Sequence, residues 1–322
     1  MKKKIIPLLA VVLAIGAALT FHFTKYMKDS KDTEELFREN VLSAGYENTV
    51  ETAFAQTEIY SIIKEHFASP LPEGKKEKKA VIIGYDGCRA DVLTQVQKEN
   101  SAINALLEEG ASKKLSYCGG VNFPEKNTQD TSTAPGWCSI LTGVWADEHG
   151  ITGNDITKSL NTKTLLTSLT EEETIDSSVF ITKWAGHFSR KNATYLLEKE
   201  YCEKNSLDVS FSKTKDDSAS LEAFKNEVSR EDCADFLFVI FEPTDSTGHS
   251  FGFTINNPRY KEAFIEADKF GFDALSAIKE RESFENEDWL IIITSDHGGI
   301  GTDHGKESIQ ERMTFTVINK EF

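Results

Sequence analysis

The sequence predicts an α/β fold with a mainly parallel central sheet. Short apolar runs rich in β-branched residues recur along the chain at 80–85, 236–241, 289–293 and 314–318. Stretches with helical spacing of apolar residues separate these runs, and strands that alternate with helices form parallel sheets covered by helices on both faces. The region 80–322 is long enough to bury one large core. We therefore expect it to form a single three-layer α/β/α domain.

The first 27 residues have the pattern of a signal sequence. Lysines at 2–4 precede an apolar run at 5–23, and a positive end followed by an apolar stretch is typical of export. The run is long enough to span a bilayer, which takes ~20 residues, and no clear small-x-small cleavage site follows it. We expect an uncleaved signal anchor, with a cleaved signal peptide as the alternative. The rest of the chain should then be extracytoplasmic.

Residues 28–79 indicate a helical spacer or a packed amino-terminal extension, followed by a linker. Apolar residues at helical spacing predict two helices that are broken near Gly45. The stretch 69–79 begins Ser-Pro-Leu-Pro and is rich in lysine. This composition is typical of a linker, and we expect its lysines to face solvent.

Within the region 80–322, the spacing of apolar residues predicts one helix at 91–109, directly after the first strand. A second helix should begin at Pro258 and run to about Arg281, because proline is favoured at the first helical position. The stretch 183–235 is less regular. We expect it to hold a cap or insert that shapes a substrate pocket.

Charge and cysteine content exclude some classes of protein. The formal net charge of −16 argues against binding to nucleic-acid polymers or anionic lipid, because such proteins usually present basic surfaces. Five cysteines are an odd number, so at least one is free or pairs with another chain if the others are bridged. No metal-ligand spacing marks Cys88 or Cys138, and we expect both to be packing residues.

Six side chains of metal-ligand type follow the apolar strands. They are Asp86, Asp245, His249, Asp296, His297 and His304. Loops that leave the carboxyl ends of parallel strands meet in one crevice, so these side chains can lie together. A mixed set of aspartate and histidine favours Zn²⁺, with Mn²⁺ or Fe as alternatives, because Mg²⁺ and Ca²⁺ sites usually lack histidine. The sequence therefore predicts a hydrolase with two divalent metal ions.

Some of these motifs also have a structural explanation. Asp86 precedes a glycine, and Asp-Gly pairs commonly form turns. Thr133 lies before Ala-Pro-Gly and a helix-like segment at 137–141, where a hydroxyl can be aimed at a phosphoryl group. Ser132 or Thr133 can equally be an ordinary N-cap. The loop 294–305 has two Asp and two His among glycines, which let a backbone fold closely around an ion.

Together these motifs resemble the alkaline phosphatase superfamily, and within it the type I phosphodiesterase/nucleotide pyrophosphatase family, which includes the ecto-nucleotide pyrophosphatases. The resemblance runs from about Ala80 to the carboxyl terminus and implies an alkaline phosphatase-like fold. The matching segments occur in the family's order: Tyr-Asp-Gly-Cys-Arg at 85–89, Thr-Ala-Pro-Gly with Ser-Ile-Leu-Thr-Gly at 133–143, Glu-His-Gly-Ile-Thr-Gly-Asn at 148–154, Asp-Ser-Thr-Gly-His at 245–249 and Ser-Asp-His-Gly at 295–298.

The resemblance also implies roles for individual residues. Thr133 would be the nucleophile and would form a covalent phosphothreonine that water then hydrolyses. Asn154 would donate a hydrogen bond to a phosphate oxygen. One zinc ion would be held by Asp86, Thr133, Asp296 and His297, and the other by Asp245, His249 and His304. The implied substrate is a small phosphodiester, nucleotide or lipid head group, although Ala134 stands where nucleotide pyrophosphatases often have phenylalanine.

Other functions use much of the same sequence. A phosphomonoesterase or a phosphoryl-group transferase would use the same metals and Thr133. A sulfatase would need a Cys or Ser maturation motif with an arginine, which the segment 133–137 lacks. A membrane-tethered binding protein without turnover is the alternative from another class, and the complete set of ligands and nucleophile argues against it. The aromatic residues expected either to wall a leaving-group pocket or to lie in the core are Trp137, Trp184, Phe188 and Phe251. We expect His149 to make a structural hydrogen bond.

Overall fold

The structure is a computed structural model that describes residues 32–120, 124–154, 160–189 and 191–321. The expected signal anchor at 5–23 lies outside this part of the chain. Within the described part, no helix combines the length and the apolar character needed to cross a membrane.

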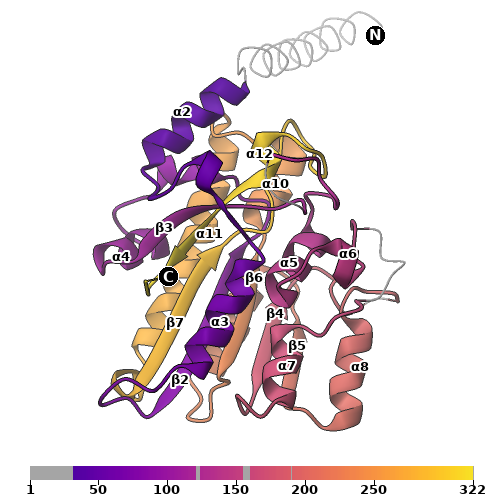
Figure 1. The fold of residues 1–322 in the computed structure, drawn as a ribbon. Coiled ribbons are helices and arrows are strands. Elements are labelled where there is room, and N and C mark those ends of the chain that lie inside the picture. Colours follow the sequence, from indigo (N-terminus) through magenta and orange to yellow (C-terminus); the bar gives the residue numbers. More distant parts are fainter. Residues whose placement is uncertain (1–31, 121–123, 155–159, 190, 322) are drawn as a thin grey trace, which may run out of the picture.

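A mixed sheet of eight strands forms the centre of the molecule, in the order β1-β3-β8-β7-β2-β6-β4-β5 (Figure 1). The strands are β1 (Phe54–Ala55), β2 (Glu77–Tyr85), β3 (Ser112–Tyr117), β4 (Ser178–Thr182), β5 (Val209–Lys213), β6 (Phe236–Phe241), β7 (Glu287–Thr294) and β8 (Met313–Ile318). Strand β8 is antiparallel to its neighbours β3 and β7, and the other described pairs are parallel. The expected mainly parallel sheet is confirmed.

Helices cover both faces of this sheet. Figure 1 shows α3 on one face and α11 on the other. The described helices are α2 (Glu34–Ala44), α3 (Glu58–Ala68), α4 (Ala102–Glu108), α5 (Thr133–Thr142), α6 (Ala146–His149), α7 (Leu165–Glu171), α8 (Leu196–Asn205), α9 (Asp217–Val228), α10 (Pro243–Phe251), α11 (Pro258–Lys279) and α12 (Ile309–Arg312). The short 3₁₀ helices in the described residues are η1 (Val50–Thr52), η2 (Ala90–Gln95) and η3 (Phe284–Asn286).

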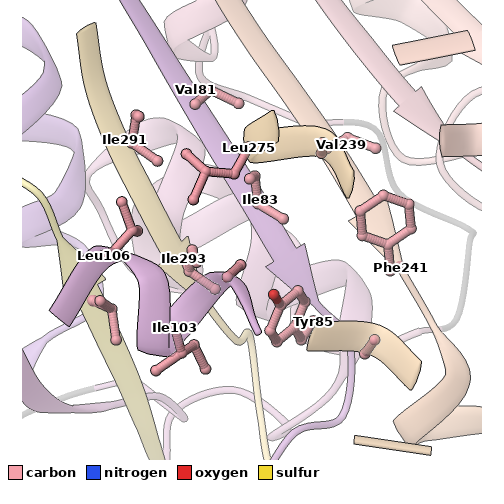
Figure 2. Close-up of a cluster of buried hydrophobic side chains, with 14 of the residues drawn as sticks. Val81, Ile83, Tyr85, Ile103, Leu106, Val239, Phe241, Leu275, Ile291 and Ile293 are labelled. Atoms are coloured by element: carbon pink, nitrogen blue, oxygen red, sulfur yellow. The ribbon is translucent and has the colours of Figure 1, made fainter. Parts of the chain in front are cut away.

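The central strands carry the core because both of their faces are buried. Alternate residues of β2, from Val81 to Tyr85, enter one apolar cluster with side chains of α4, α9 and α11 (Figure 2). Ala80 and Ile82 enter the cluster on the opposite face, with side chains of α3, α5 and α7. A parallel strand buried on both faces needs a continuous apolar run, which is why the sequence reveals β2, β6 and β7 so clearly.

Of the two helices predicted within the region 80–322, one forms as expected and the other does not. The helix expected at 91–109 is split into η2 and α4. Asn100 has a left-handed backbone with φ of 55°, and the Ser101 side chain accepts a hydrogen bond from the Asn104 amide as the N-cap of α4. Helix α11 begins at Pro258 as expected, with Asn257 as its N-cap. A helical spacing of apolar residues therefore did not reveal the local cap that interrupts it.

The segment before β2 packs against the sheet. Helix α2 ends at Gly45, which has a left-handed φ of 68°, and this confirms the expected break between two helices. Strand β1 pairs with β3, so this segment adds an edge strand to the sheet. Strand β2 begins at Glu77, inside the expected linker. The expectation of solvent-facing lysines is wrong for Lys79, which is buried. Its Nζ atom lies 3.1 Å from an Asp235 carboxylate oxygen, which compensates the buried charge.

The expected irregular insert at 183–235 contains regular structure. It holds α8, β5 and α9, and β5 pairs in parallel with β4 at the edge of the sheet. Only part of an edge strand is buried, so its apolar alternation is weak. This explains why the sequence pattern did not reveal it.

All five cysteines are buried and none is in a disulfide. Cys88 belongs to the cluster shared with α11, and Cys138 belongs to the cluster on the opposite face. Their expected role as packing residues is confirmed.

Candidate metal centre

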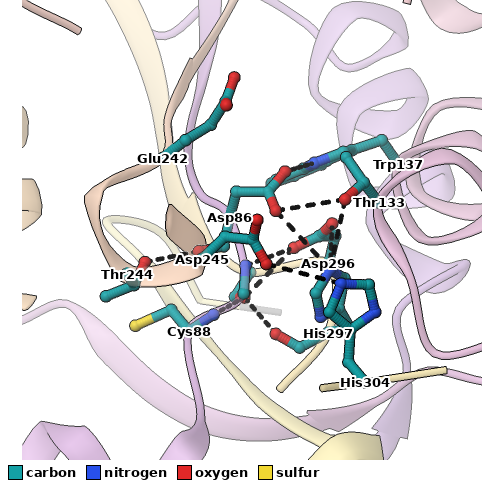
Figure 3. Close-up of polar contacts among 12 residues, drawn as sticks. Asp86, Cys88, Thr133, Trp137, Glu242, Thr244, Asp245, Asp296, His297 and His304 are labelled. Atoms are coloured by element: carbon teal, nitrogen blue, oxygen red, sulfur yellow. Dashed lines mark hydrogen bonds and ion pairs between the residues drawn. The ribbon is translucent and has the colours of Figure 1, made fainter. Parts of the chain in front are cut away.

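The candidate ligands leave three adjacent strands. Asp86 directly follows β2, Asp245 lies on α10 after β6, and Asp296 lies two residues after β7. Strand β2 lies between β6 and β7 and is parallel to both. The three carboxyl ends therefore open at the same edge of the sheet, where ligands bind in folds of this type. Figure 3 shows the side chains converging there.

Asp86, Asp296 and His297 form a buried cluster whose ligand atoms all lie within 4.8 Å of one another. The His297 Nε2 atom is 3.6 Å from Asp86 Oδ1 and 3.4 Å from Asp296 Oδ2. The Thr133 hydroxyl completes this group, because its Oγ1 atom lies 3.4 Å from both Asp86 Oδ1 and His297 Nε2. The structure thus brings together all the residues expected around the first metal ion.

Asp245, His249 and His304 form a second cluster, again with ligand atoms within 4.8 Å of one another. The Nε2 atoms of the two histidines are 3.0 Å apart, and they lie 3.4 Å and 3.6 Å from Asp245 Oδ1. The rings of His304 and His297 have centroids 4.1 Å apart. The two clusters are therefore neighbours in one centre.

The hydrogen bonds of the three histidines orient their Nε2 atoms as ligands. In each ring Nδ1 donates to a backbone carbonyl. His297 donates to the Gly298 carbonyl at 2.7 Å. His249 donates to the Thr302 carbonyl and His304 to the Thr131 carbonyl, both at 3.1 Å. This leaves an Nε2 lone pair facing the centre of each cluster. Two such lone pairs at 3.0 Å repel each other unless a cation lies between them.

The residues present fit divalent metal ions. Asp245 Oδ1 and Asp296 Oδ2 are buried and have no hydrogen-bond partner within the described part of the chain. A buried carboxylate oxygen without a partner is costly, and a bound cation would compensate it. Two atoms bound tetrahedrally to one zinc ion at about 2.0–2.1 Å lie roughly 3.3 Å apart. The spacings of 3.4 Å and 3.6 Å around Asp245 Oδ1 are close to this value.

Burial shifts the pKa values of these groups in the direction that favours their neutral forms. It raises the pKa of the Asp86 carboxyl, and burial followed by neighbouring carboxylates raises the pKa values of Asp245 and Asp296 well above the usual range. Burial lowers the pKa of His297 to about 4, and burial with the two neighbouring histidines lowers the pKa of His304 to about 3. His297 and His304 are therefore neutral at pH 7, as metal ligands must be.

Thr133 is the first residue of α5, at the positive end of a helix of ten residues. Ser132 occupies the N-cap position of α5, as the alternative expected, but its side chain makes no cap hydrogen bond and its Oγ atom is buried without a partner among the described residues. Asn154 lies beside this helix start, with its Oδ1 atom accepting from the Ala134 amide at 2.8 Å. That bond makes Nδ2 the donor end of the Asn154 side chain.

Several supporting contacts were not expected from the sequence. The Trp137 indole donates to Asp86 Oδ2 at 2.9 Å, the Thr244 hydroxyl donates to the Asp86 carbonyl, and the Gly87 amide donates to Asp296 Oδ1 at 3.1 Å. Trp137 is fully buried, so it orients a ligand rather than forming an open pocket wall. The signal that could have found it is Gly84, because a Cβ atom there would lie 2.4 Å from the Trp137 ring.

The other aromatic candidates divide between core and surface. Phe188 is buried in the core, whereas Trp184 and Phe251 are half-buried. The Arg259 guanidinium lies over the Phe251 ring, with its Cζ atom 3.9 Å from the ring centroid. His149 has the expected structural role, with Nδ1 accepting from the Ile151 amide at 3.1 Å.

Glu242 and Lys183 lie at the margin of the centre and were missed. Glu242 directly follows β6, and its Oε1 atom accepts from the Trp184 amide at 3.1 Å. Lys183 directly follows β4, and its Nζ atom lies 2.7 Å from Asp217 and 3.8 Å from Glu242. Burial and the Asp86 carboxylate raise the pKa of Glu242 to about 8. Their positions at strand ends are the same signal that identified Asp86.

A parallel α/β sheet that presents two Asp/His clusters and a helix-start hydroxyl at its carboxyl edge is typical of metal-dependent hydrolases. The family model for type I phosphodiesterase / nucleotide pyrophosphatase matches residues 80–314, which is most of the chain. The chain therefore belongs to this family of hydrolases.

Solved structures of low sequence identity are similar to this chain. Murine ectonucleotide pyrophosphatase / phosphodiesterase 5 matches with 18% identity and a TM-score of 0.47, and an inactive form of it in complex with AMP matches with 17% identity and the same TM-score. Both matches cover 69% of this chain and 57% of the murine chain. Phosphonoacetate hydrolase from Sinorhizobium meliloti matches with 14% identity and a TM-score of 0.45, over 69% of this chain and 56% of its own. No curated protein sequence matches.

Proposed function

We propose that this protein is a two-metal phosphodiesterase of the nucleotide pyrophosphatase type, with an alkaline phosphatase-like fold and Thr133 as its nucleophile. The observation that carries the proposal is the position of the Thr133 hydroxyl, 3.4 Å from both Asp86 Oδ1 and His297 Nε2 at the start of α5. Membership of the type I phosphodiesterase family supports the reaction class.

The ligand sets follow the two clusters. Asp86, Thr133, Asp296 and His297 would hold one ion, and Asp245, His249 and His304 would hold the other. Zinc suits this mixture of imidazole and carboxylate donors best, and manganese is the alternative. Bound ions of this kind lower the pKa of a hydroxyl and stabilise the charge on phosphoryl oxygens.

The chain's own residues then divide the work of substitution at phosphorus. The Thr133 hydroxyl donates to Asp86 Oδ1, which points its proton away from the substrate; the hydroxyl loses this proton to solvent, and the Oγ1 atom attacks phosphorus. The bond to the departing alcohol oxygen breaks on the opposite side and this oxygen takes up a proton from solvent, which leaves a phosphothreonine still esterified with the second alcohol. Water then attacks the phosphothreonine, releases the monoester of the second alcohol, and returns a proton to the Thr133 oxygen, which restores the hydroxyl. The Asn154 Nδ2 group donates to a non-bridging oxygen in both steps.

The location of the protein is a separate proposal. The lysines at 2–4 and the apolar run at 5–23 support export, with the run retained as a membrane anchor or removed as a signal peptide. Carbonate extraction of membranes from cells that make the full chain would test this. An anchored protein stays with the membranes, a processed one is secreted, and a soluble cytoplasmic protein would contradict both forms.

The decisive experiment measures metal content and hydrolysis on the purified full chain. The substrates are bis-p-nitrophenyl phosphate, p-nitrophenyl phosphate and p-nitrophenyl sulfate, each with and without a chelator. We expect two bound metal ions per chain and chelator-sensitive preference for the diester. Preference for the monoester would instead indicate a phosphomonoesterase. Two metals without turnover would favour the binding-protein alternative.

Thr133→Ala should abolish hydrolysis with at least one metal ion retained. Its matched control is Ser132→Ala, which removes the neighbouring buried hydroxyl that has no hydrogen-bond partner in the described structure. The control should remain active. Full activity of Thr133→Ala would remove Thr133 from the mechanism.

A further inference from the structure

A cavity of about 520 Å³ is lined by residues that adjoin the candidate metal centre in sequence. Three of its wall residues are close in sequence to site residues: Gly305 follows His304, Thr152 precedes Asn154 by two residues, and Asp130 precedes Thr133 by three. The Asp130 amide donates to the Thr152 carbonyl at 2.7 Å, so two walls are joined directly. The third wall, at Gly305, is joined to the same segment, because the Gly305 amide donates at 3.0 Å to the hydroxyl of Thr131, the residue after Asp130.

Asp130 is the residue that connects the cavity to the centre. Its carboxylate lies against Gly153, the residue before Asn154, where an added Cβ atom would be only 2.4 Å from Asp130 Oδ2. On the other side, an added Cβ atom at Gly305 would be 3.9 Å from the Asp130 Cβ atom. Glycine at 153 therefore leaves room for this carboxylate beside the residue proposed to bind phosphate, while Gly305 lies at ordinary contact distance from it, next to a proposed metal ligand.

Apart from Gly305, the described residues that line the cavity are all of polar or charged type, and none has an aromatic or branched aliphatic side chain. The lining includes Asn127, Thr128, Asp130, Thr152, Lys306 and Glu307. A nucleobase is usually held against aromatic rings, and the described part of this lining offers none. The two carboxylates outnumber the single ammonium, so the cavity favours a substituent with hydrogen-bond donors over a further phosphate group.

We propose that this cavity binds one alcohol substituent of the phosphodiester, and that Asp130 selects substituents carrying hydroxyl or ammonium donors. The inference rests on the proposed phosphodiesterase function and deepens it. The substrate class is a diester of a small polyol or amino alcohol, and neither a nucleoside nor a pyrophosphate fits the lining as well.

Three substrates with the same carbon skeleton test this on the metal-loaded full chain: glyceryl, 3-aminopropyl and propyl p-nitrophenyl phosphate. All three release p-nitrophenolate, so only the retained substituent differs. We expect kcat/KM for the glyceryl and aminopropyl substrates to exceed that for the propyl substrate by about tenfold, which is about 1.4 kcal/mol. Equal values within about twofold would overturn the inference.

Asp130→Ala should bring the ratios of the glyceryl and aminopropyl values to the propyl value down to about one, with metal content retained. Asp130→Asn keeps an acceptor without the charge, so it should lose more of the aminopropyl preference than of the glyceryl preference. The control is Asp147→Ala, an exposed aspartate outside the cavity lining. A fall of equal size on all three substrates in Asp130→Ala would show a merely structural role and overturn the inference.

A binding measurement separates this inference from the hydrolase proposal. If no diester is hydrolysed, the proposed function fails, and calorimetric titration with glycerol 1-phosphate and propyl phosphate still tests the cavity. Binding of glycerol 1-phosphate about tenfold tighter than propyl phosphate, lost in Asp130→Ala, would support the cavity assignment on its own. Equal affinities would overturn it.

Discussion

The buried Trp137 indole donates a hydrogen bond to Asp86 Oδ2 at 2.9 Å, while Asp86 Oδ1 lies 3.4 Å from the Thr133 hydroxyl. One carboxylate is thus held by a core side chain through one oxygen and faces the nucleophile through the other. Partners of this kind fix the orientation of a metal ligand and tune its affinity. Packing of the core and geometry of the centre therefore meet at Asp86.

Trp137→Phe should weaken metal binding at the first cluster with little change in the fold. Phenylalanine fills most of the space but cannot donate to Asp86, and loss of such a partner typically costs 10–100-fold in metal affinity or activity. Competition with a fluorescent zinc chelator measures this. The matched control is Trp289→Phe, because that indole donates to Glu287 at 2.7 Å away from the centre. Equal loss of affinity in both variants would contradict the assignment.

The strands that build the centre were predictable because they are buried on both faces. Strands β2, β6 and β7 each contain a continuous apolar run, and their ends locate Asp86, Asp245 and Asp296. The start of β2 was not predictable. The buried Lys79 ammonium donates to the Cys233 carbonyl and to the Asp235 carboxylate, and Asp235 lies 156 residues away in sequence.

Positions in the site were predictable where a residue follows a strand, and contacts were not. The bond from Trp137 to Asp86 spans 51 residues, and the bond from Ala134 to Asn154 spans 20. Contacts between residues so far apart in sequence depend on how the helices pack over the sheet, and the spacing of residue types along the sequence does not encode that packing. Glu242 was within reach of the same rule that found Asp86, because it directly follows β6.

Asp245→Ala should lower the metal content from two ions to one per chain, because it removes the carboxylate that both His249 and His304 approach. Elemental analysis of the purified variant measures this directly. The control is Ser246→Ala, one residue further along α10. Two tightly bound ions in Asp245→Ala would exclude the residue as a ligand.

Asn154→Ala should lower kcat/KM for bis-p-nitrophenyl phosphate by about 10²–10³-fold, the loss typical for one donor that stabilises charge in a transition state. Metal content should not change, because Asn154 contacts the helix start through Ala134 and belongs to neither cluster. Steady-state kinetics beside elemental analysis separate the two effects. A variant that loses metal along with activity would give Asn154 a structural role.

Arg89→Met should lower the free energy of unfolding far more than the loss of a surface charge does. The buried guanidinium lies 2.8 Å from Asp91, which is also buried, and 2.6 Å from Asp32. Removing one partner of a buried ion pair costs about 3–5 kcal/mol because the other charge stays buried. Urea unfolding measures the loss. Arg38→Met, which breaks partly exposed pairs, is the control and should cost at most about 1 kcal/mol. A similar cost for both variants would contradict the prediction.

His187→Phe should make the stability of the protein less sensitive to acid. Neither ring nitrogen of His187 has a hydrogen-bond partner in the described structure, and its ring packs among Phe180, Trp184 and Tyr195. Burial lowers the pKa of His187 to about 3 in the folded state. In the unfolded state the His187 pKa is near 6.5, so the imidazole binds a proton at a pH where the folded state keeps it neutral. Stability therefore falls as pH drops below about 7. At pH 5 this difference amounts to about 2 kcal/mol, which the phenylalanine variant should retain. Urea unfolding of both proteins at pH 7.5 and pH 5 measures the effect, and parallel losses in the two proteins would show that His187 contributes nothing to acid sensitivity.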